Sequence, residues 1–184
     1  IMNFIIRNSS GIVCLSITPS QMARLNLSYM VPPHENTSQR GTPFTISIDA
    51  KEGITTGVSA ADRVVTIKTA IKDTASPNDI YKPGHIFPLC AKAGGVLERP
   101  GHTEGAIDIV HLAGFNKSAV LCEIMNPDGT MARGEKLRAF AKVHDLVLLS
   151  IDDLIEYRML KEHLIVEEAT TEITLDKYGL FKLT

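Results

Sequence analysis

The chain has 184 residues and a formal net charge of −2, and 44% of its residues are hydrophobic, which fits one ordinary domain with a sizeable core. The near-neutral charge argues against a broad nucleic-acid-binding face. No apolar stretch is long enough to cross a bilayer, and no signal peptide is visible. The three cysteines, Cys14, Cys90 and Cys122, are scattered and odd in number, as is typical of a reduced protein. We therefore expect a cytoplasmic location and neither a nucleic-acid nor a membrane partner.

The first half of the chain predicts short helices and strands that alternate. Residues 2–7 are typical of the final turns of a helix, and the apolar, partly β-branched run 12–17 predicts a buried strand. Thr18 followed by Pro19 predicts the start of a short helix. Residues 44–49 alternate with period two, which indicates a half-buried strand.

The second half continues this mixture. A capping residue at Ser59 predicts a helix that ends near residue 72, and residues 81–98 predict a long loop with a short strand. The remaining predictions are helices over 103–113, 133–144 and 151–164 and strands over 119–125 and 146–150, the last of them buried.

Helices and strands interleave without a strict βαβ repeat, so the sequence predicts an α+β (mixed α/β) fold with a mixed β-sheet covered by helices. From Glu167 the composition shifts to Thr, Glu and β-branched residues. We therefore expect a first domain over residues 1–160, and a linker with the start of a second domain over residues 161–184. Both ends resemble interrupted elements, which suggests a piece of a longer protein.

Two glycine-containing loops carry the residues with the clearest chemistry. Pro83-Gly84-His85 is the first, and the second runs from Arg99 through Pro100, Gly101 and His102 to Thr103 and Glu104. The Arg99 guanidinium can donate two hydrogen bonds to phosphate oxygens, and Gly101 permits the backbone to approach a ligand closely. The amides near Thr103 sit where a helix N-terminus favours anions, and His102 offers an imidazole to a metal. Taken singly, however, a loop histidine is more often structural or merely exposed.

Three further positions allow both a structural and a functional interpretation. Glu123 interrupts an apolar strand, and it is equally compatible with an outward-facing carboxylate and with an acid or base at the end of a strand. Cys14 lies in a predicted core strand, where an inert cysteine is the default. Asp62 and Arg63 are most simply a carboxylate at a helix start and a surface arginine.

Taken together, these segments resemble the 3,4-dihydroxy-2-butanone 4-phosphate synthases of riboflavin biosynthesis. The matching segments occur in the family's order: 10–14 (SGIVC), 57–63 (GVSAADR), 83–89 (PGHIFPL), 101–104 (GHTE), 121–123 (LCE) and 128–133 (DGTMAR). Residues 172–181 are similar to the opening of a GTP cyclohydrolase II-like domain, which is fused behind the synthase in many bacteria. The expected protein is thus the synthase half of a bifunctional fusion with a dihydroxybutanone phosphate synthase-like fold.

The resemblance implies a lyase that converts D-ribulose 5-phosphate to L-3,4-dihydroxy-2-butanone 4-phosphate and formate with Mg²⁺, or alternatively Mn²⁺. It implies a homodimer with active sites at the interface. Catalytic roles fall on His85, Glu123 and Cys14, and the implied metal ligand is His102. The implied substrate contacts are Arg99, Pro100, Gly101, His102, Thr103 and Glu123.

One feature of the family is missing from this sequence. An acidic loop of the Arg-Glu-Asn-Glu-Gly-Asp type should precede Cys14 and supply a glutamate ligand to the metal. We therefore expect residues 1–184 to fold but to show at most trace activity. An alternative is a non-catalytic sugar-phosphate-binding or dimerisation remnant, and a weaker third is a metal-dependent sugar-phosphate hydrolase, which would release no formate.

Overall fold

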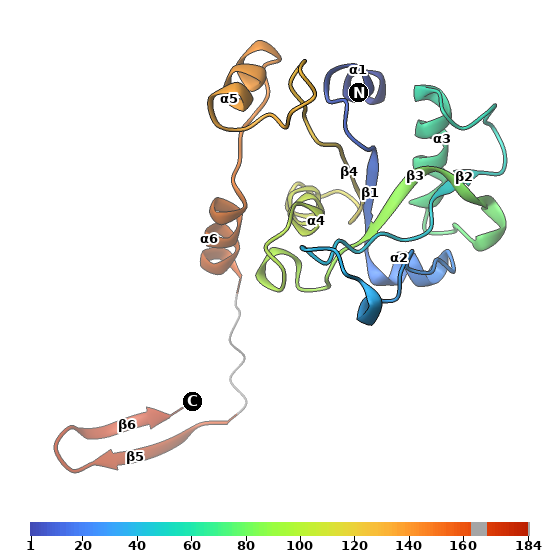
Figure 1. Cartoon of the computed structure of the whole chain (residues 1–184). Coiled ribbons are helices and arrows are strands. Elements are labelled where there is room, and N and C mark those ends of the chain that lie inside the picture. The colour runs from blue at the N-terminus through green and yellow to red at the C-terminus, as the bar shows by residue number, and fades with distance from the viewer. Residues whose placement is uncertain (163–168, 184) are drawn as a thin grey trace.

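A mixed, four-stranded β-sheet with the order β2-β3-β1-β4 forms the centre of the protein (Figure 1). A computed structural model describes residues 1–162 and 169–183. The strands of the sheet are β1 (Cys14–Ile17), β2 (Ile48–Ala50), β3 (Ile80–Cys90) and β4 (Ala119–Leu121). β1 and β3 are parallel, whereas β2 and β4 run antiparallel to their neighbours. The predicted mixed sheet is therefore confirmed.

Helices pack around this sheet, as predicted. The α-helices are α1 (Met2–Asn8), α2 (Pro19–Arg24), α3 (Ala60–Ala70), α4 (His102–Leu112), α5 (Gly134–Val143) and α6 (Ile151–Lys161), and the short 3₁₀ helices are η1 (Pro33–Glu35), η2 (Pro77–Asp79) and η3 (Gly95–Leu97). α3 packs against β2, β3 and α1, while α4 packs against β1, β4 and α6. None of the described helices is long and apolar enough to span a membrane.

Local signals for helix starts are confirmed by the hydrogen bonds at the caps. Thr18 Oγ1 accepts from Gln21 N, and Gln21 Oε1 accepts from Thr18 N, which forms a reciprocal capping box at α2. Ser59 caps α3 by accepting from Asp62 N at 3.0 Å. These contacts stay within a few residues of the chain, so the sequence pattern suffices to predict them.

The core forms where apolar side chains of the central strands meet the helices. Leu15 and Ile17 of β1, Ile48 of β2 and Ile86 of β3 are all buried, and Leu25 closes the cluster after α2. Burial of these side chains removes apolar surface from water, which is the main favourable contribution to folding.

β3 corrects the prediction of a long loop with a short strand over 81–98, because it is a strand of 11 residues. Its pairing with β2 is irregular: Ile48 pairs with Ile86, whereas Asp49 pairs with Tyr81. Residues 82–85 therefore form a bulge opposite a single step of β2. Breakers such as Pro83 are tolerated at bulges, so they did not end the strand as the sequence suggested.

Three other predicted elements differ in extent. The strand expected over 44–49 is reduced to isolated bridges at Phe44 and Thr45, followed by β2. The strand expected over 119–125 ends at Leu121. α6 ends at Lys161 rather than residue 164, although residues 163 and 164 of that prediction lie outside the described residues.

The predicted buried strand over 146–150 is wrong. Residues 146–149 form no regular element, and Leu146, Val147, Leu148 and Leu149 are all exposed. The described chain covers these side chains only in part, and Val147 is 94% exposed.

The described C-terminal residues form a separate two-stranded antiparallel hairpin of β5 (Thr171–Leu175) and β6 (Gly179–Leu183). Ile173 pairs with Phe181 in its register. The last described residues therefore belong to a strand, and residue 184 lies outside the described residues.

Candidate active site

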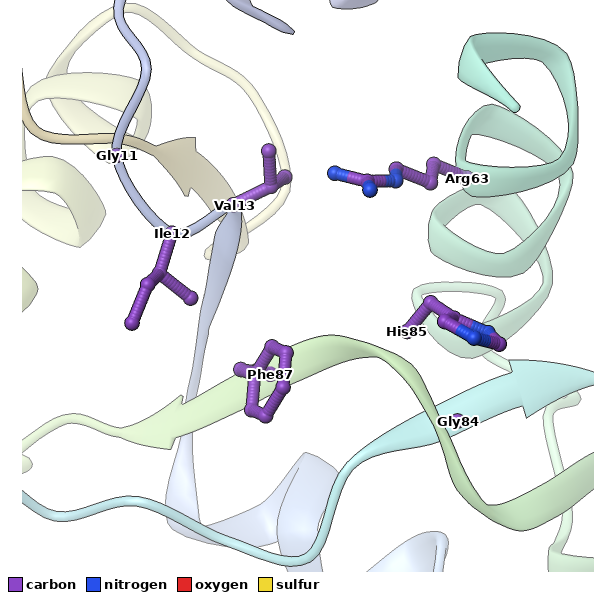
Figure 2. Close-up of a pocket in the computed structure, with 7 residues that line it drawn as sticks. All are labelled: Gly11, Ile12, Val13, Arg63, Gly84, His85 and Phe87. Atoms are coloured by element: carbon purple, nitrogen blue, oxygen red, sulfur yellow. The ribbon is translucent and has the colours of Figure 1, made fainter. Parts of the chain in front are cut away.

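A pocket of about 210 Å³ opens beside the start of β1 and the bulge of β3 (Figure 2). Its lining residues come from three places: the segment before β1, helix α3 and strand β3. They are Gly11, Ile12, Val13, Arg63, Gly84, His85 and Phe87. The pocket therefore contains one imidazole and one guanidinium beside apolar side chains.

His85 is presented to this pocket by the bulge. Gly84 permits the geometry because a Cβ at this position would collide with the backbone of Ile48. Gly84 N also donates to Ser47 Oγ at 3.1 Å, which anchors the bulge to the segment before β2. The glycine of the Pro-Gly-His sequence thus allows the backbone of β3 to approach the backbone of β2 closely.

Asp49 contacts both the ring and the backbone amide of His85. Asp49 Oδ2 lies 2.6 Å from His85 Nδ1, and Asp49 Oδ1 accepts from His85 N at 3.0 Å. The Asp49 side chain is 10% exposed, while that of His85 is 45% exposed. A buried carboxylate therefore orients a histidine that remains accessible from the pocket.

Arg63 enters the same pocket from α3, and its side chain points toward the segment of Gly11 to Val13 (Figure 2). Its Nε donates to Val58 O at 2.9 Å, which fixes the base of the guanidinium. The interpretation of Arg63 as a surface arginine missed this placement. The expected role of Asp62 is confirmed, because this buried carboxylate accepts from Thr55 and Gly57 at the start of α3.

Glu123 lies just past β4, the edge strand of the sheet, and its side chain reaches back to the segment that lines the pocket. Its Oε2 accepts from Ile12 N at 3.0 Å. A Cβ on Gly11 would come within 2.5 Å of the same oxygen. The residue is exposed, as the structural interpretation expected, and its contact with Ile12 places it next to the pocket lining. The interpretation of Glu123 as an acid or base stays a prediction.

Cys14 is buried in β1, where it pairs with Phe87 on one side and Leu121 on the other. Burial, with smaller contributions from the nearby Glu123 and Cys122, raises the pKa of the Cys14 thiol to about 12. The thiol therefore stays protonated at neutral pH, and Cys14 is not among the residues that line the pocket.

The second loop lies at the N-terminus of α4, where Gly101 is the N-cap and Thr103 is buried. Arg99 is already paired: its Nη1 donates to Glu104 Oε2 at 2.6 Å, and its Nη2 donates to Arg40 O. Glu104 has none of its side chain exposed, and its other oxygen accepts from Lys92 N. This buried carboxylate shapes the loop and orients Arg99.

His102 is the first residue of α4 and is exposed. Within residues 1–162 and 169–183, no group of three or more His, Cys, Asp or Glu side chains is arranged to hold a metal ion. Magnesium prefers oxygen ligands and retains several waters. His102 alone therefore does not make a metal site.

Of the predicted site residues, His85 lines the pocket, and Glu123 contacts its wall through the backbone of Ile12. The predicted residues Arg99, Pro100, Gly101, His102 and Thr103 lie together at the start of α4, and none of them lines that pocket. Sequence reasoning missed Asp49 and Arg63. Asp49 occupied the end of an alternating strand, and only the long-range register of β2 with β3 places it beside His85.

Comparison with known proteins identifies the family. Residues 1–157 match the sequence model of the 3,4-dihydroxy-2-butanone 4-phosphate synthase family. The synthase of Shewanella sediminis is 57% identical over 157 residues, which cover 85% of this chain and 71% of the relative. The synthase of Salmonella paratyphi B is 55% identical and covers 88% of this chain and 73% of the relative.

Solved structures agree with these relatives. The crystal structure of RibBX, a two-domain 3,4-dihydroxy-2-butanone 4-phosphate synthase from A. baumannii, has a TM-score of 0.87 and 43% identity, and it covers 98% of this chain. This chain spans about half, 52%, of that protein. A synthase in complex with two magnesium ions has a TM-score of 0.81 at 37% identity, covering 89% of this chain and 81% of that one. The predicted fold and family are confirmed: this chain belongs to the 3,4-dihydroxy-2-butanone 4-phosphate synthases, enzymes of riboflavin biosynthesis.

Proposed function

We propose that this chain supplies the site that converts D-ribulose 5-phosphate to L-3,4-dihydroxy-2-butanone 4-phosphate and formate. The observation that carries the proposal is an accessible histidine, His85, held by the buried carboxylate of Asp49 in a member of this family. The reaction requires proton removal next to a carbonyl, and an oriented imidazole is suited to it.

The phosphate end of the substrate would bind at α4. The first amides of this 11-residue helix and the Arg99 guanidinium both favour an anion. Glu104 holds Arg99 in place through the 2.6 Å contact, so the guanidinium is positioned before the substrate arrives. Gly101, Thr103 and the variable Pro100 would contribute backbone and side-chain contacts around the phosphate.

His85 and Glu123 would move protons during the reaction. Each can accept a proton in its basic form and return it in its acidic form. Cys14, protonated and buried, would contribute packing beside the substrate rather than a nucleophile.

A divalent ion would stabilise the negative charge that develops on the substrate oxygens. His102 would be its ligand from this part of the chain, with the other positions taken by substrate, water and an acidic segment. A family structure holds two magnesium ions, which favours Mg²⁺, and Mn²⁺ remains an alternative prediction.

We further propose a homodimer whose interface carries the sites. The exposed apolar residues at 146–149 support this proposal, because side chains of this kind are normally covered. The division into a synthase domain over 1–160 and the start of a GTP cyclohydrolase II-like domain over 161–184 stays a prediction, as does a cytoplasmic location.

The test is product analysis after incubation with D-ribulose 5-phosphate and Mg²⁺, with formate and inorganic phosphate both quantified. We expect formate at a low rate and no phosphate, and excess chelator should abolish formate release. His102→Ala should lower the rate further, whereas the exposed His34→Ala should not.

The other outcomes would contradict a part of this proposal or favour a different function. Formate release that persists in excess chelator would contradict the metal's role. Phosphate without formate would favour the hydrolase. Substrate binding without any product, measured by calorimetry, would favour the non-catalytic remnant.

A further inference from the structure

We infer that Asp49 is a positioning residue that fixes the tautomer of His85, so that the Nε2 lone pair is the one offered to the pocket. This inference rests on the proposed function only for its kinetic consequence. The tautomer itself follows from the contacts around the imidazole ring, which are independent of any substrate.

The donor and acceptor inventory of the pair determines the tautomer. A carboxylate accepts hydrogen bonds and has no proton to give. Asp49 Oδ1 already accepts the backbone N–H of His85 at 3.0 Å, which holds the carboxylate against this residue. The 2.6 Å contact between Oδ2 and Nδ1 is then a hydrogen bond that Nδ1–H donates. In the neutral ring, Nε2 therefore carries the lone pair.

The surroundings leave little freedom for another arrangement. Gly57 lies against the pair at a φ of +85°, and a Cβ there would collide with Asp49 Oδ2 and His85 Nδ1. Gly57 is itself held by Asp62, whose Oδ2 accepts from Gly57 N at 3.1 Å. The turn before α3 thus closes over the hydrogen bond, while His85, 45% exposed, still lines the pocket together with Arg63 (Figure 2).

A purely structural role for Asp49 has to be separated from this one. The carboxylate also ties the bulge of β3 to β2, and loss of that link would destabilise the protein. A structural role predicts changes in melting temperature and in substrate binding. A positioning role predicts a changed ring tautomer and a loss of kcat at nearly constant KM.

The decisive variant is Asp49→Asn. Its side-chain oxygen can still accept from His85 N, but its amide donates to Nδ1 and moves the ring proton to Nε2. We expect ¹⁵N NMR of the ring nitrogens to report Nδ1–H in the wild-type chain and Nε2–H in the variant, both measured with the neutral ring. The expected loss of kcat is on the order of 10²- to 10⁴-fold, with KM within about two-fold.

Glu52→Gln is the matched control, because it removes a carboxylate from an exposed position three residues along the chain. It should change neither the ¹⁵N spectrum nor the kinetics. Wild-type protein with Nε2–H, or an Asp49→Asn protein with an unchanged tautomer, would overturn the inference. A folded Asp49→Asn variant whose kcat is within two-fold of wild type would do the same.

The NMR measurement and the kinetic measurement can fail independently of each other. If Asp49→Asn does not fold, the wild-type spectrum still decides, because Nδ1–H is required there. If the chain releases no formate, the proposed function fails while the NMR measurement continues to test the tautomer.

Discussion

Cys14 shows how burial sets the chemistry of a single side chain. It is 3% exposed, and burial, together with Glu123 and Cys122 nearby, raises the pKa of its thiol to about 12 from 9.0. In the unfolded chain the thiol would ionise above pH 9, whereas in the folded chain it keeps its proton. The folded state therefore binds more protons between these values, so Cys14 contributes stability below pH 9 that is lost as the pH approaches 12.

We predict that Cys14→Ala weakens the alkaline loss of stability. The difference in free energy of unfolding between wild type and variant should be roughly 1–2 kcal/mol at pH 7 and should shrink above pH 9, by about 1 kcal/mol per pH unit. Urea unfolding at several pH values measures it. Val13→Ala, at a buried position without a titrating group, should show a cost that does not depend on pH. If the loss in free energy of unfolding caused by Cys14→Ala is also independent of pH, the prediction is contradicted.

The residues that the sequence could and could not identify differ in the range of their contacts. His85, His102 and Glu123 stand out because glycine loops and an interrupted apolar run are visible within a few positions. Asp49 and Arg63 do not, because their significance depends on a strand register and on a helix that faces a distant loop. No pattern within either local segment carries that information.

At the scale of elements, an ion-pair cluster links α6 to α4 and to η3. Arg158 Nη1 donates to Asp108 Oδ2 on α4 at 2.8 Å and to Gly94 O at 2.9 Å. Asp108 Oδ2 also accepts from Val96 N at 2.8 Å, which links η3 to the same point. The Arg158 and Asp108 side chains are both largely buried, so the removal of one partner leaves the other charge without compensation.

We predict that Arg158→Ala destabilises the protein by roughly 3–5 kcal/mol in urea unfolding, because Asp108 stays buried without its partner. Arg138→Ala is the matched control, since its 2.9 Å pair with Glu135 is exposed on α5. It should cost less than about 0.5 kcal/mol. Similar losses for both variants would show that the buried cluster does not hold α6.

Most elements were predictable from local signals, and the exceptions have a common physical cause. Capping contacts at Thr18 and Ser59 placed α2 and α3, because these contacts span only a few residues. β3 was misjudged because Pro83 and Gly84 read as breakers, while the bulge that accommodates them depends on β2. Element boundaries that depend on a partner strand are not contained in the segment itself.

At the scale of the whole molecule, the last residue of α5 and residues 146–149 after it form an exposed apolar segment. Val143 and Val147 are 77% and 94% exposed, and Leu146, Leu148 and Leu149 are exposed as well. The apolar run over 146–150 led to the prediction of burial in a strand, but the described chain covers it only in part. Hydrophobicity indicates that a segment is buried somewhere, and it does not say whether the same chain covers it.

We predict that this segment is covered by a second copy of the chain. Light scattering should give a mass twice the 20.1 kDa of one chain, and Val147→Glu should shift the protein toward the monomer, because burial of an unpaired carboxylate is costly. Asn78→Glu places the same charge at an exposed position outside the segment and should leave the dimer intact. Both variants should keep the wild-type circular dichroism spectrum, which separates loss of assembly from loss of fold. A monomeric wild type would exclude the dimer, and a dimer that survives Val147→Glu would place its interface on another surface.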